Sequence, residues 1–118
     1  MNKQKICIIG DGLTGLSAAA ILSQDNIKID LFVGNKNYNK SRSDTRTTAV
    51  SESSYQFIKQ KLNINKKFPF WPCKEINLFI ENNKDFTNFL NFKKKNLMYI
   101  FQNHKLKKKL KEEISKKK

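Results

Sequence analysis

Apolar and polar positions divide the first part of the chain into a strand, a helix and a second strand. Residues 6–9 form an uninterrupted apolar run that stops at Gly10. Such a run is typical of a parallel strand that is buried on both faces. Residues 13–23 are rich in alanine and carry apolar residues at helical spacing. Residues 27–33 alternate, with Ile29, Leu31 and Val33 on one face, and predict the second strand.

The rest of the pattern predicts shorter elements. Ser51 is a suitable N-cap for a helix over residues 52–62. Asn103 is a suitable N-cap for a helix that ends at about Ile114, with an apolar stripe of Leu106, Leu110 and Ile114. Alternation predicts strands over residues 73–81, 86–92 and 97–101. We therefore expect an α/β fold: a βαβ dinucleotide-binding (Rossmann-like) unit, then a helix, a β-hairpin and a C-terminal basic helix.

Three glycines follow the first strand with the spacing Gly10-x-Gly12-x-x-Gly15. Gly10 permits the tight turn out of the strand, Gly12 lets backbone approach a pyrophosphate, and Gly15 lets the helix lie close to the strand. The N–H groups and the positive end of the helix dipole would face the phosphates. Asp11 is an anion in a loop suited to an anion, and we expect its side chain to point to solvent. The alternative is a tight strand–helix turn that binds no nucleotide.

The second strand lacks one feature of dinucleotide-binding folds. An Asp or Glu usually stands at its tip, where it binds a ribose hydroxyl pair. Here Val33 occupies that tip, followed by Gly34 and Asn35. Either Asn35 or a backbone group replaces the acid, or affinity for the cofactor is reduced.

Charge and composition narrow the function classes. The chain has 118 residues with 24 Lys+Arg against 10 Asp+Glu, a formal charge of +14. Such an excess often marks nucleic-acid or anionic-membrane partners. Its lysines are spread along the chain and do not alternate with aromatics, so we expect no nucleic-acid binding. Residues 105–118 are the exception, and a peripheral membrane contact through this basic helix stays open as an alternative.

No signal peptide and no stretch of about 20 apolar residues is present, which favours a cytoplasmic protein. Cys7 and Cys73 form no disulfide framework, and Cys7 is expected to be an inert core residue. His104 is the only histidine, so we predict no metal site.

The order of the motifs resembles the N-terminal part of the flavin hydroxylases of ubiquinone biosynthesis, relatives of para-hydroxybenzoate hydroxylase. The glycine motif, an Asp-x-Arg-x-x-Ala-hydrophobic-Ser segment at residues 44–51, the Pro72-Cys73 strand entry and the Asn103-x-x-Leu106 helix start occur in the order of that family. The resemblance covers essentially the whole chain, and the segment at residues 44–51 is its most specific part.

The resemblance implies FAD as cofactor. Its pyrophosphate would be wrapped by Gly10, Gly12, Leu13, Thr14 and Gly15. Arg46 would lie along the cofactor near its pyrophosphate and ribityl chain, and Asn103 would hydrogen-bond it from the start of the last helix. In the intact enzyme of that family, NAD(P)H would reduce the flavin, and the flavin hydroperoxide would hydroxylate an aromatic quinone precursor.

The alternative to each of these two roles is structural: Arg46 as an exposed loop arginine and Asn103 as a plain helix N-cap. Arg42 and Arg46 are the arginines of a lysine-dominated chain, which favours a role for a planar, forked donor.

The chain is shorter than such hydroxylases, so we interpret residues 1–118 as a single, incomplete FAD-binding domain that needs a missing part or a complementary chain. We expect the isolated chain to be marginally folded, and we assign no catalytic residue in it. A stand-alone NAD- or nucleotide-binding module and a non-functional fragment remain alternatives.

Overall fold

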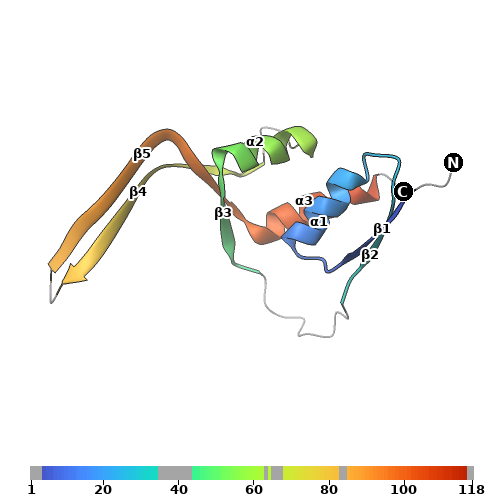
Figure 1. The fold of residues 1–118 in the computed structure, drawn as a ribbon, viewed down its shortest axis with the longest axis horizontal. Coiled ribbons are helices and arrows are strands. Elements are labelled where there is room, and N and C mark those ends of the chain that lie inside the picture. The colour runs from blue at the N-terminus through green and yellow to red at the C-terminus, as the bar shows by residue number, and fades with distance from the viewer. Residues whose placement is uncertain (1–3, 35–43, 63, 65–67, 83–84, 117–118) are drawn as a thin grey trace.

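The computed structural model describes residues 4–34, 44–62, 64, 68–82 and 85–116. It is a mixed α/β structure, as predicted, with a parallel pair of strands, an antiparallel sheet and helices between them. The molecule is elongated, with extents of 64 × 36 × 26 Å. Its length comes from a hairpin that projects away from the helices (Figure 1).

The predicted strand–helix–strand unit is present. Strand β1 (Lys5–Ile9) leads into helix α1 (Leu13–Leu22), and strand β2 (Lys28–Phe32) returns parallel to β1. Ile6 pairs with Ile29 and Ile8 with Leu31. A parallel pair needs a crossover between its strands, and α1 provides it.

The prediction that β1 is buried on both faces is wrong for the described residues. Ile6 and Ile8 are half-buried, whereas Cys7 and Ile9 are exposed, Ile9 by 86%. Cys7 is therefore not the core residue that the apolar run predicted. On the same open face Lys5 forms an ion pair with Asp30 at 2.7 Å, which lowers the pKa of the Asp30 carboxyl.

The second sheet has the strand order β3-β5-β4 and is antiparallel. Its strands are β3 (Thr47–Ser51), β4 (Trp71–Asn82) and β5 (Asp85–Gln102). The strand β3 was not predicted. The strands predicted at residues 86–92 and 97–101 are parts of one continuous strand. The lysines between them, residues 93–95, belong to this extended strand and are exposed to solvent.

Helix α2 (Glu52–Lys61) begins where predicted. The Ser51 side chain accepts a hydrogen bond from the Ser54 backbone N–H at 3.2 Å, which is the expected cap. The helix lies over the second sheet through aromatic contacts: Tyr55 stacks on Tyr99 with ring centroids 3.8 Å apart and meets Phe70 edge-on at 4.9 Å.

Helix α3 (Asn103–Ser115) runs beside α1 (Figure 1) and closes the main core. Gln102 is its N-cap residue and Asn103 its first helical residue, so the prediction that Asn103 caps this helix is wrong by one position. The core contains residues of both helices, of the segment after α2 and of β5: Leu16, Ala20, Leu62, Ile64, Phe101, Leu106 and Leu110. All three predicted stripe residues of α3 contribute, because Ile114 packs against this core.

The β4–β5 hairpin has two unlike faces. Register places Ile76 opposite Phe92 and Leu78 opposite Leu90 on one side of the ribbon. We call Ile76, Leu78, Ile80, Leu90 and Phe92 the apolar face of the hairpin; all but the half-buried Ile76 are 40–46% exposed. The other side carries both polar and apolar residues: the Asn91 side chain donates to Glu75 at 2.8 Å, and Phe79 and Phe86 are 58% and 71% exposed.

Within the part of the chain that the structure describes, none of the helices combines the length and the apolar character needed to cross a membrane.

Candidate functional site

The segment that links β1 to the first turn of α1 (residues 10–15) is hereafter the glycine loop. Gly10 adopts a φ of +106°, a conformation that side chains rarely tolerate. Its N–H donates to the Phe32 carbonyl at 2.8 Å, which ties the turn to the end of β2. The predicted role of Gly10 in the tight turn is confirmed.

Gly15 is required by close packing. A Cβ at this position would lie 2.3 Å from the Gly10 carbonyl oxygen and 3.5 Å from a methyl group of Ile8. The contact partner is backbone and cannot move aside cheaply. The predicted close approach of helix and strand is therefore confirmed at Gly15.

Gly12 is different from both. It is the N-cap residue of α1, with φ −68° and ψ 174°, a conformation open to any residue. A Cβ added there would have no described atom within 4 Å. Neither the backbone nor the packing of the described residues requires glycine at this position.

The N-terminus of α1 has no side-chain cap from any residue that the structure describes. Its first turn contains no acid. The first N–H groups of a helix lack intrahelical partners, and the helix dipole places partial positive charge there. The backbone of Leu13, Thr14 and Gly15 thus presents donors at the edge of the glycine loop.

Asp11 does not simply point to solvent. Its carboxylate lies 3.4 Å from the Lys111 ammonium of α3, with side chains 32% and 50% exposed. A cavity of about 230 Å³ is lined by Asp11 and Lys111 together with Leu31 and Val33, at the carboxyl ends of β1 and β2. The strand β2 ends at Phe32, so Val33 follows it; Asn35, the other residue considered for ribose binding, lies outside the described residues.

Arg46 pairs with an acid of its own segment. Its Nε and Nη2 donate to the two Asp44 carboxylate oxygens at 2.8 and 3.0 Å, and its side chain is 77% exposed. The guanidinium lowers the pKa of Asp44 from 3.8 to about 2, with a smaller contribution from Lys107. The forked donor geometry expected of Arg46 is therefore in use.

Asn103 joins the Arg46 segment to α3. Its backbone N–H donates to the Arg46 carbonyl at 3.0 Å, and its Oδ1 accepts the Thr48 hydroxyl at 2.7 Å. The residue is 8% exposed. Next to it, the His104 Nδ1 lies 3.0 Å from the Asp44 carbonyl oxygen. Two of the four segments on which the family resemblance rests, residues 44–51 and the start of α3, are thus in direct contact.

The predicted site residues form two groups. Gly10, Gly12, Leu13, Thr14 and Gly15 lie together in the glycine loop, and Arg46 and Asn103 meet at the start of α3. The helix α3 connects the groups, because Lys111 contacts Asp11 eight residues after Asn103. At 1.5 Å per residue this separation is about 12 Å along the helix axis.

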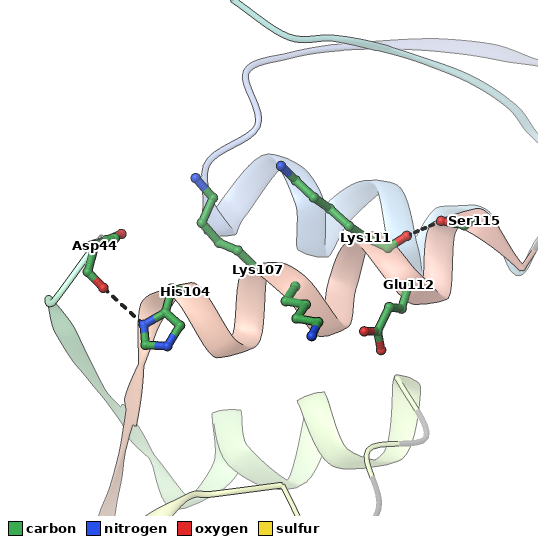
Figure 2. Close-up of a pocket in the computed structure, with 7 residues that line it drawn as sticks. Asp44, His104, Lys107, Lys111, Glu112 and Ser115 are labelled. Atoms are coloured by element: carbon green, nitrogen blue, oxygen red, sulfur yellow. Dashed lines mark hydrogen bonds between the residues drawn. The ribbon is translucent and has the colours of Figure 1, made fainter. Parts of the chain in front are cut away.

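Sequence reasoning missed the lysines of α3 that approach this region. A cavity of about 510 Å³ lies along the helix, lined by Asp44, His104, Lys107, Lys111 and other residues of α3. Figure 2 shows Lys107 and Lys111 extending from one side of α3 and Glu112 from the other. The four-residue spacing of Lys107 and Lys111 places them on one face of the helix, and this could have been noticed in the sequence. It did not distinguish them, because the helix contains many other lysines.

Among the described residues, no group of three or more His, Cys, Asp and Glu is placed to hold a metal ion. No protein-family model matches the chain, and comparison with curated proteins likewise gives no match.

Proposed function

We propose that this chain is the FAD-binding part of a flavin-dependent aromatic-ring monooxygenase and that its glycine loop holds the cofactor's pyrophosphate. Gly12 is the observation that carries the proposal. Helix N-cap positions favour Ser, Thr, Asp or Asn as well as glycine, and nothing in the described chain excludes a side chain here. Close approach by a group from outside the chain would explain why position 12 has no side chain.

The surroundings indicate that this outside group is an anion. The uncapped N-terminus of α1 presents backbone donors and partial positive charge, and no acid of its first turn opposes them. The one acid of the glycine loop, Asp11, is paired with Lys111. Phosphate oxygens accept hydrogen bonds from such donors. A pyrophosphate at Gly12 would contact backbone alone, which suits a position without a side chain.

The second group of residues supports a cofactor longer than a single phosphate. Because the Asn103 Oδ1 accepts the Thr48 hydroxyl, its Nδ2 hydrogens are the donors that it would offer to the cofactor. Arg46 has five N–H donors and Asp44 engages two of its nitrogens, so the remaining donors would serve a phosphate or ribityl oxygen. Both groups contact α3, the glycine loop at Lys111 and the Arg46 segment at Asn103.

When bound, FAD would supply the redox chemistry, with NAD(P)H as reductant and an aromatic quinone precursor as substrate of the intact enzyme. The residues of this chain would bind and orient the cofactor. We assign none of them as an acid, base or nucleophile. The substrate class rests on the resemblance alone.

The proposal is tested by titrating the 118-residue chain with FAD, NADH and riboflavin, using equilibrium dialysis. We expect FAD to bind at least about tenfold more tightly than riboflavin, because riboflavin lacks the pyrophosphate. Gly12→Val should abolish this preference while changing the unfolding midpoint little, since a Cβ at this position has no described atom within 4 Å.

Equal binding of FAD by the Gly12→Val variant would overturn the proposal. A preference for NADH over FAD would favour instead a module that binds NAD without the hydroxylase chemistry.

A further inference from the structure

Helix α3 places two lysines on the side that faces the glycine loop. Lys107 and Lys111 are four residues apart and therefore share one face of the helix. Figure 2 shows both side chains extending to the same side of α3. Lys111 reaches the loop itself, where its ammonium lies 3.4 Å from the Asp11 carboxylate.

Positive charge exceeds negative charge on this face. Asp11 forms an ion pair with Lys111. Asp44, whose pKa is lowered in part by the charge of Lys107, is already paired with Arg46. Glu112 extends to the other side of the helix in Figure 2, although it lines the same cavity as Lys107 and Lys111. Like charges at this spacing repel each other, and an added anion between them would reduce the repulsion.

We propose that Lys111, assisted by Lys107, binds the phosphate groups of a dinucleotide held at the glycine loop. This inference rests on the proposed function, because it assumes that the loop is the phosphate site. In the free protein the Lys111 ammonium is paired with the Asp11 carboxylate, and the phosphates would compete with that carboxylate for it. The ammonium then neutralises charge on the phosphates as a point charge, without the forked geometry of an arginine.

The same contact has a purely structural alternative, in which the Asp11–Lys111 pair only fastens α3 to the loop. The two roles predict opposite effects for Asp11. Removing its charge strengthens phosphate binding if Lys111 is a ligand group, because a repulsive anion is lost and the ammonium is released. Removing it weakens binding as much as removing Lys111 does if the pair is a fastener.

The experiment measures dissociation constants of FAD and of inorganic pyrophosphate for the wild type and five variants at fixed ionic strength. Lys111→Gln should weaken both ligands about three- to fivefold, and Lys107→Gln about twofold, as expected for partly exposed charges. Asp11→Asn should tighten both about twofold, and Lys111→Arg should bind like the wild type.

Lys109→Gln is the matched control, because Lys109 is on the same helix but pairs with Glu113 at 2.9 Å. It should change binding less than 1.5-fold. Urea unfolding of each variant identifies any loss of binding that comes from loss of folding. Lys111→Arg keeps the positive charge and therefore tests whether the charge at this position supports binding.

Lys111→Gln binding like Lys109→Gln would overturn the inference, and so would equal weakening by Asp11→Asn and Lys111→Gln. If FAD binds but the lysine variants have no effect, this inference fails and the proposed function stands. If the wild type binds pyrophosphate in a Lys111-dependent way but does not bind FAD, the proposed function fails and this inference stands. Absence of binding by both ligands overturns both.

Discussion

Gly15 and Gly12 should respond differently to substitution by alanine, because only Gly15 is closely packed against other atoms of the chain. Gly15→Ala places a methyl group 2.3 Å from the Gly10 carbonyl oxygen, where a carbon–oxygen contact of at least about 3.3 Å is normal. The helix and the turn must therefore separate by about 1 Å. Gly12→Ala places the same methyl group where no described atom lies within 4 Å.

The expected magnitudes follow from these contacts. Overpacking of this kind costs about 1–3 kcal/mol, and the better helix propensity of alanine returns about 1 kcal/mol when the residue lies in a helix interior. Gly15 lies in the first turn, where the propensity gain is smaller, so we expect a net loss of about 2 kcal/mol. Gly12→Ala should stay within about 0.5 kcal/mol of the wild type or stabilise it slightly, through the reduced entropy of the unfolded chain.

Thermal unfolding followed by far-ultraviolet circular dichroism measures both variants, in buffer with sucrose because the chain is expected to be marginally stable. For a chain of this length about 2 kcal/mol corresponds to a fall of about 8 °C in the midpoint. A Gly15→Ala midpoint equal to that of the wild type would refute the packing argument. An equally large fall for Gly12→Ala would refute the statement that the fold does not need glycine there.

Three further changes test the second group of site residues and the hairpin. Thr48→Val removes the hydroxyl that Asn103 accepts at 2.7 Å, and urea unfolding should report a loss of about 1–2 kcal/mol because Asn103 is 8% exposed. Carbon-13 NMR titration should give a pKa of about 2 for Asp44, and Arg46→Gln should return it toward 3.8. Because Arg46 depresses this pKa, the stabilisation by the pair is complete above about pH 4 and is lost as the pH falls toward 2. Leu78→Thr on the apolar face of the hairpin should reduce binding of the dye ANS and change stability by less than about 0.5 kcal/mol, since Leu78 is 45% exposed.

Each of these changes has a control and a contradicting result. Thr47→Val alters an exposed neighbour on β3 and should be neutral; equal losses for Thr47 and Thr48 would contradict the role of the Asn103 contact. A normal pKa for Asp44 in the wild type would mean that Arg46 is not paired with it in solution. Asn77→Thr replaces a polar residue on the other side of the hairpin and should leave dye binding unchanged; a fall as large as that of Leu78→Thr would count against dye binding at the apolar face.

The local parts of the structure could be predicted from the sequence, because short-range rules determine them. The apolar run, the glycine spacing and the alanine-rich stretch predicted β1, the turn and α1. The Ser51 cap predicted the start of α2 because the capping bond to Ser54 spans three residues. The φ of Gly10 and the contact at Gly15 also agree with the roles expected from the spacing.

The features that escaped prediction depend on distant parts of the chain. Thr47 and Thr48 look like loop residues, and their strand conformation comes from pairing with Gln102 and Phe101. The exposure of Cys7 could not be predicted, because the apolar run does not say what covers each face of the strand. The Asp11–Lys111 contact joins residues 100 positions apart, and nothing near either residue identifies its partner.

The central claim, that the glycine loop receives the phosphates of a dinucleotide, is tested most directly by nitrogen-15 NMR of the chain during titration with FAD. The account predicts that the largest amide shifts occur at Gly12, Leu13, Thr14 and Gly15, and that inorganic pyrophosphate shifts the same amides. Largest shifts on the hairpin or in the last turn of α3, with the glycine-loop amides unmoved, would contradict it.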